Sequence, residues 1–225
     1  MSREVCAEPM NTGGNAASVA VLLFGDRRAP GPLRSLPTQR VKSPADVDAA
    51  VGPYRRLVVV GADADLATVL TRLLRADRLD VEVGYAPRRR TTATRVYRLP
   101  AGRRALRRAR RGSARRVPLI RDETGAVIVG SALWRGVDGP LHGEAVVDDA
   151  TLFDGDVTGV QIMPTAALPG LRARVVSRWP RRWVLGRAVQ LGCTGVLVTR
   201  DGVAAGRPAR RSTFYRHIEG WLLVR

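Results

Sequence analysis

The most constraining feature of this 225-residue sequence is a buried strand, a short loop and an amphipathic helix in direct succession. The run Leu57–Val60 is continuously apolar, which is typical of a strand covered on both faces. After the loop Gly61–Asp65, in which Asp65 is expected to cap the helix, apolar residues recur with the spacing of one helical face: Leu66, Val69, Leu70, Leu73 and Leu74. This order indicates a parallel sheet with helices packed on it.

Neighbouring segments extend the same pattern. Residues 19–24 and 81–85 predict further strands, and helices are expected after Ser43-Pro44 and over residues 101–111. Beyond Gly112, short strand-like runs alternate with turns, beginning with a hairpin at residues 122–125. The predicted fold class is α/β. A loose tail at residues 1–16 precedes a mostly parallel αβα lobe at 17–112 and an antiparallel, β-rich, sandwich-like lobe at 113–225.

Composition narrows the class of protein further. The chain is 45% hydrophobic and has two cysteines, which excludes an intrinsically disordered chain and a disulfide scaffold. Cys6 and Cys193 belong to no Cys-x-x-Cys motif, and His142 and His217 have no suitably spaced partners, so neither a disulfide nor a metal site is expected. Without a signal-peptide pattern or a long apolar segment, the sequence predicts a cytoplasmic protein.

The charge is large and concentrated in one segment. The formal net charge is +18, and all but one of the 38 basic residues are arginine. Between Arg88 and Arg121 the chain has 14 arginines and no acidic residue. So many uncompensated charges must face solvent and attract phosphate groups, whether of a nucleotide, an anionic lipid surface or nucleic acid. A codon bias toward arginine would also produce such a basic face without any ligand.

The loop Gly61-Ala62-Asp63-Ala64-Asp65 lies where open α/β sheets bind ligands, at the carboxyl end of a strand. Small residues at such a loop let backbone N–H groups approach a phosphate, and the N-terminus of the next helix adds partial positive charge. Alanine at two positions and the negative charge of Asp65 weaken this pattern. The loop is therefore either a phosphate loop or an ordinary turn in which Asp63 caps the helix or stabilises the loop.

The loop and its leucine-rich helix resemble the Gly-Gly-Asp-Gly-Thr nucleotide site of the diacylglycerol kinase catalytic domain family, lipid kinases related in fold to NAD kinases. The resemblance continues through residues 86–95, Leu99-Pro100 and the strand-like segments of the second half, to about residue 205. It implies ATP and Mg²⁺ as cofactors and phosphoryl transfer to a lipid hydroxyl. The nucleotide or phosphate site that it implies consists of Gly61, Ala62, Asp63, Ala64, Arg88, Arg89, Arg90 and Thr91, with Asp201 and Gly202 facing it from the second lobe.

The sequence departs from the family pattern where the chemistry takes place. Alanines replace loop glycines, Asp65 replaces the threonine, and residues 88–92 replace the family's Gly-Thr-Gly-Asn-Asp segment. The family's Asp-Gly-Glu, whose glutamate acts as the base, is here Asp201-Gly202-Val203, and valine cannot accept a proton. We therefore predict a degenerate member that binds an anion or nucleotide without efficient phosphoryl transfer, and we assign no catalytic residue. The alternative is a basic module that binds nucleic acid or an anionic membrane surface. Binding to a membrane surface would make the protein peripheral to the membrane.

Overall fold

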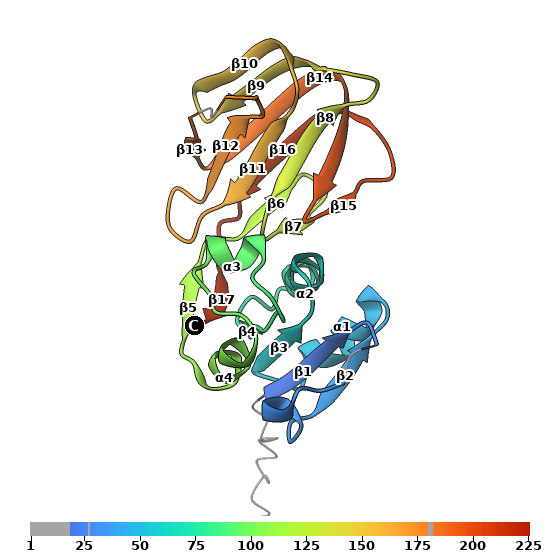
Figure 1. Cartoon of the computed structure of the whole chain (residues 1–225), viewed down its shortest axis with the longest axis vertical. Coiled ribbons are helices and arrows are strands. Elements are labelled where there is room, and N and C mark those ends of the chain that lie inside the picture. The colour runs from blue at the N-terminus through green and yellow to red at the C-terminus, as the bar shows by residue number, and fades with distance from the viewer. Residues whose placement is uncertain (1–18, 27, 180–181) are drawn as a thin grey trace, which may run out of the picture.

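The computed structural model describes residues 19–26, 28–179 and 182–225, which form two lobes stacked along the long axis (Figure 1). The tail expected at residues 1–16 lies outside the described residues. The first lobe contains a mostly parallel sheet with helices, and the second contains an antiparallel sheet. The predicted fold class is confirmed.

Sheet A of the first lobe has the strand order β2-β1-β3-β4-β17-β5, in which all neighbours are parallel except β17 and β5. Its strands are β1 (Val19–Phe24), β2 (Thr38–Val41), β3 (Arg56–Val60), β4 (Glu82–Tyr85), β5 (Ala114–Val117) and β17 (Trp221–Val224). The neighbouring interior strands β1 and β3 are almost wholly buried because their continuous apolar runs are covered on both faces.

Helices cover both faces of sheet A. They are α1 (Pro44–Val51), α2 (Asp63–Arg75), α3 (Thr92–Val96) and α4 (Arg103–Arg111), with a short 3-10 helix at Gly31–Leu33. The apolar faces of α1 and α2 share one core with alternate residues of β1 and β3, whereas α4 and the 3-10 helix pack on the opposite face. Gly84 of β4 allows α4 to approach closely, because a Cβ there would lie 2.8 Å from the Cβ of Ala109.

Sheet B of the second lobe is antiparallel throughout, with the main strand order β13-β12-β11-β8-β14-β16-β6-β7. Its strands are β6 (Ile120–Asp122), β7 (Val127–Ile128), β8 (Ala132–Gly136), β9 (Leu141–Val147), β10 (Ala150–Val157), β11 (Val160–Pro164), β12 (Leu171–Val175), β13 (Val184–Gly186), β14 (Ala188–Arg200), β15 (Val203–Ala204) and β16 (Ala209–Arg216). The long β14 pairs with β9 through its first half and with β8 through its second, so the sheet folds over its own apolar core.

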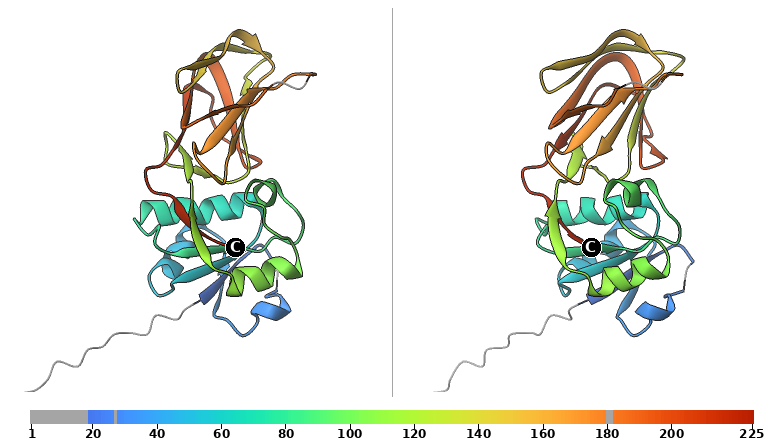
Figure 2. Two further views of the ribbon diagram at one scale, coloured as in Figure 1. Left: turned by 90° about the vertical axis from the view of Figure 1, so that its left-hand side faces the viewer. Right: turned by 60° about the vertical axis from the view of Figure 1, so that its left-hand side comes forward.

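The C-terminal segment crosses back from the second lobe to the first, as Figure 2 shows. Strand β17 lies between β4 and β5 in sheet A, and the indole of Trp221 packs edge-on against the Tyr97 ring at 5.4 Å. The sequence-based division at residue 112 therefore does not describe sheet membership, because β5 and β17 lie beyond it and still belong to sheet A. Periodicity could not reveal this, since a four-residue apolar run carries no information about its partner strand.

The lobes also meet along α2. The backbone N–H of Val127, at the start of β7, donates to the side-chain oxygen of Thr71 at 3.0 Å. The predicted helices α1, α2 and α4 are present. The N-cap position of α2 is Ala62, and Asp65 caps the helix from its first turn by accepting a hydrogen bond from the backbone N–H of Ala62. None of the helices in the described part of the chain is long and apolar enough to cross a membrane.

Candidate functional site

The loop between β3 and α2 is closed by its own carboxylate. Asp65 folds back over the start of α2, where its side chain accepts a hydrogen bond from the backbone N–H of Ala62 at 2.7 Å. The same carboxylate lies where a Cβ on Gly61 would stand, so residue 61 must be glycine. A helix N-terminus attracts anions because its first N–H groups have no partner within the helix. In this chain the carboxylate of Asp65 places a negative charge at the N-terminus of α2.

Asp63 ties the loop to two other elements. One oxygen of its carboxylate accepts from the hydroxyl of Tyr85 at 2.8 Å, and the other accepts from the backbone N–H of Ala93 at 3.0 Å. Tyr85 ends β4 and Ala93 lies in the first turn of α3, so Asp63 fixes both beside the loop. The sequence-based alternative in which Asp63 stabilises the loop agrees with these contacts.

Asp201 reaches the same place from the second lobe. It follows β14 with a positive φ of 47°, and its carboxylate accepts from three consecutive backbone N–H groups, those of Val129, Gly130 and Ser131, at 2.7–2.9 Å. A Cβ on Gly130 would lie 2.9 Å from an oxygen of Asp201 and 2.9 Å from an oxygen of Asp63. The fold thus brings the two carboxylates, 138 positions apart in the sequence, to the same glycine.

Burial and the neighbouring carboxylate perturb the ionisation of this cluster. The pKa of Asp201 is raised from 3.8 to about 6: burial is the largest cause, the charge of Asp63 also raises it, and the hydrogen bonds from the three N–H groups lower it. Burial and Asp63 also raise the pKa of the Tyr85 hydroxyl, which remains a proton donor to Asp63. A carboxyl group with a strongly raised pKa, such as that of Asp201, is a feature of functional sites, although structural networks produce such groups too.

Replacing Asp63 with asparagine is expected to lower the pKa of Asp201 slightly from about 6, because one of the two charges is removed while burial, the main cause of the raised pKa, remains. In the wild type, the carboxyl group of Asp201 keeps its proton between about pH 4 and 6 in the folded state, whereas in the unfolded chain it has lost it. The contribution of Asp201 to stability therefore falls as the pH rises through this window. The change in pKa is measured by following the Asp201 carboxyl carbon by NMR. An unaltered titration in the variant would show that Asp63 does not act on Asp201.

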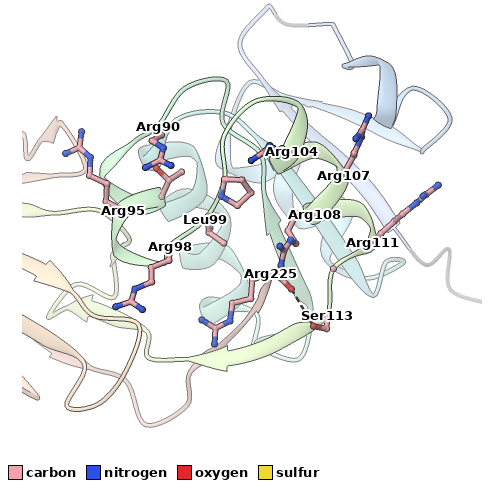
Figure 3. A pocket seen from close by; sticks show the side chains of 13 residues that line it. Arg90, Arg95, Arg98, Leu99, Arg104, Arg107, Arg108, Arg111, Ser113 and Arg225 are labelled. Atoms are coloured by element: carbon pink, nitrogen blue, oxygen red, sulfur yellow. Dashed lines mark hydrogen bonds between the residues drawn. The ribbon is translucent and has the colours of Figure 1, made fainter.

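The remaining predicted site residues separate into two groups. Thr91 lies near Asp63, since it caps α3 by accepting from the N–H of Thr94 at 3.2 Å, one residue beyond Ala93. Arg88, Arg89 and Arg90 are exposed, and Arg90 lines a different hollow, between α3 and α4 (Figure 3). That hollow is lined by residues 90–113 and Arg225, all outside sheet B, so the arginines do not rim a cleft shared by both lobes.

Gly202 and Val203 form the exposed turn after Asp201. Gly202 has a φ of 88°, a conformation that favours glycine, and the side chain of Val203 is 58% exposed. Ala62 is exposed and Ala64 is half-buried. Because their side chains are methyl groups, they have no polar atom with which to bind a phosphate. Sequence reasoning missed Tyr85 and Gly130, because a buried tyrosine at the end of a strand and a glycine in an apolar run are ordinary features on their own.

The closed loop does not fit a magnesium-bound triphosphate in this arrangement. Both oxygens of Asp63 accept hydrogen bonds, and a phosphate at the start of α2 would have to displace Asp65 and overcome its charge. Within the described ranges, no three His, Cys, Asp or Glu side chains gather closely enough to hold a metal ion.

The two lobes and their strand order define the fold of the NAD kinase and diacylglycerol kinase structures, as the resemblance implied. No family model and no curated protein matches the sequence. Among solved structures, an NAD kinase from Archaeoglobus fulgidus in complex with ATP matches with a TM-score of 0.63 at 10% identity, over 92% of this chain and 93% of that one. Two structures of putative diacylglycerol kinases from Bacillus anthracis match with TM-scores of 0.67 and 0.69 at 10% and 9% identity, over 92% of this chain and 96–97% of theirs.

Proposed function

We propose that this chain is a diacylglycerol-kinase-like protein that binds phosphate-bearing ligands without efficient phosphoryl transfer. The observation that carries the proposal is the Asp65 carboxylate bound to the Ala62 N–H, in the position where a helix N-terminus would otherwise receive a phosphate. Val203 adds support, because the position that the resemblance gives to a base carries an apolar, exposed side chain. The net charge of +18 favours an anionic ligand.

A kinase that uses ATP and Mg²⁺ is the alternative, since a structure with the same fold is in complex with ATP. A direct assay separates the two: the protein is incubated with labelled ATP, Mg²⁺ and diacylglycerol in mixed micelles. We expect no transfer above the protein-free background. Transfer that disappears in an Asp63→Asn variant would contradict the proposal. The cytoplasmic location expected from the sequence belongs to the same proposal.

Replacing Asp65 with threonine, the residue in the family pattern, is expected to strengthen ATP binding by about tenfold or more, because it removes a negative charge within a few ångströms of the phosphate position. Calorimetry with ATP and Mg²⁺ measures the change. Asp46→Thr is the matched control: Asp46 accepts from the backbone N–H of Ser43 at 2.7 Å in the same position of α1, away from the loop. Equal affinities in the wild type and both variants would show that Asp65 does not block the site.

A further inference from the structure

The hollow between α3 and α4 is strongly positively charged. It has a volume of about 1020 Å³, is open to solvent, and is bordered on one side by Arg90, Arg95 and Arg98, and Arg225 lies between this side and helix α4 (Figure 3). No acidic residue lines it, and in the part of the chain that the structure describes none of these side chains makes an ion pair. We call this hollow the arginine basin.

Helix α4 forms the other side of the arginine basin. It presents Arg104, Arg107, Arg108 and Arg111 with the spacing of one helical face, whereas its apolar residues pack under sheet A. This row of charges spans about 10 Å along the helix, a length over which duplex nucleic acid carries about six phosphates. The row therefore matches a repeating phosphate chain better than a single phosphate.

The structure of the first lobe does not explain all of these arginines. Arg108 and Arg111 lie in the last turn of α4, where positive charge favours a helix. Arg104 lies in the first turn, where positive charge is unfavourable, and Arg90 and Arg107 are exposed. Arg110, by contrast, turns away from the basin and donates to the backbone oxygen of Pro32 at 2.7 Å. Eight arginine residues line the hollow, and although some of their side chains point outward (Figure 3), their positive charges repel each other, so an anion would stabilise this arrangement.

The chemistry of the arginine basin favours nucleic acid over a membrane. Proteins that bind the membrane surface usually insert apolar side chains, but the basin is concave and none of the exposed large hydrophobic residues of the described chain lines it. It also lacks an exposed aromatic residue on which an unpaired base could stack. Recognition would therefore use the phosphodiester backbone and would be tolerant of base sequence.

We propose that the arginine basin binds the phosphate backbone of duplex nucleic acid without base specificity. The proposal rests on the anion-binding part of the proposed function and does not depend on whether phosphoryl transfer is retained. Transfer to diacylglycerol together with duplex binding would contradict the proposed function alone. Tight ATP binding without duplex binding would contradict this inference alone.

The test measures binding of fluorescein-labelled 20-base-pair DNA and RNA duplexes by anisotropy at several salt concentrations. Triple replacement of Arg90, Arg104 and Arg107 with glutamate is expected to weaken binding at least tenfold and to reduce the slope of log affinity against log salt by about 3, roughly one for each lost phosphate contact. Arg135, Arg207 and Arg211 are exposed in the second lobe, and their replacement with glutamate changes the net charge equally. This control variant is expected to keep the wild-type slope.

Three results would overturn the proposal: no binding of either duplex by the wild type at about 100 mM salt, equal losses in the basin and control variants, or a requirement for the basin arginines in binding phosphatidylserine vesicles but not duplexes. The last result would assign the basin to a membrane. If circular dichroism shows that the glutamate variant is unfolded, the same three arginines are replaced with glutamine, for which the same loss of slope is expected.

Discussion

Replacing Trp221 with alanine is expected to lower the free energy of unfolding by about 3–5 kcal/mol, the usual cost of removing a buried aromatic side chain. The side chain of Trp221 is 1% exposed and lies in β17, between β4 and β5. Its loss leaves a cavity beside Tyr97 and weakens the strand by which the second lobe returns to the first. Urea unfolding followed by circular dichroism measures the difference.

Trp179→Ala is the matched control, because the same side chain is removed from a position that is 80% exposed. We expect a change within about 0.5 kcal/mol, which is typical of surface substitutions. Equal destabilisation by the two variants would mean that β17 is not an interior strand of sheet A.

Replacing Asp122 with alanine is expected to destabilise the second lobe by about 3–5 kcal/mol. Asp122 is wholly buried at the end of β6, where one oxygen accepts from the backbone N–H groups of Thr124 and Ala126 and the other faces the guanidinium of Arg200. Alanine would leave Arg200 as an uncompensated charge, and two turn N–H groups would lose their acceptor. Thermal and urea unfolding measure the change.

Asp156→Ala provides the comparison, since Asp156 pairs with His142 on the surface, where both side chains are more than half exposed. Exposed pairs contribute about 0–1 kcal/mol, so this variant is expected to unfold nearly as the wild type does. An Asp122→Ala variant no less stable than Asp156→Ala would refute the role given to the buried pair.

Under the proposed function, the closed loop keeps its place in the fold through contacts within the chain. The capping bond from Ala62 to Asp65 stabilises α2, and the contacts of Asp63 hold β4 and α3 beside the loop. The fold is retained because its cores are formed elsewhere, by the apolar faces of α1, α2 and α4 on sheet A and by the folded sheet B.

Local patterns were sufficient for most elements of the first lobe. Continuous apolar runs predicted β1 and β3, the helical spacing of leucines predicted α2, and Ser43-Pro44 predicted the start of α1. These predictions succeeded because the spacing of apolar residues along a single segment indicates whether one face or both faces of that segment are buried. The N-cap residue of α2 could not be read from the sequence, because Ala62 has no side-chain acceptor that marks a helix start, and Asp65 caps the helix from its third position instead.

The sequence by itself determined the αβα character of the first lobe, the antiparallel character of the second, and the large positive charge between Arg88 and Arg121. Only the tertiary structure decided that β17 enters sheet A, that Asp63 and Asp201 meet at Gly130, and that Arg90 faces α4 instead of the loop. The physical reason is distance along the chain. Periodicity and capping act within a few residues, whereas strand partners and converging side chains depend on how separate elements pack, which no single segment encodes.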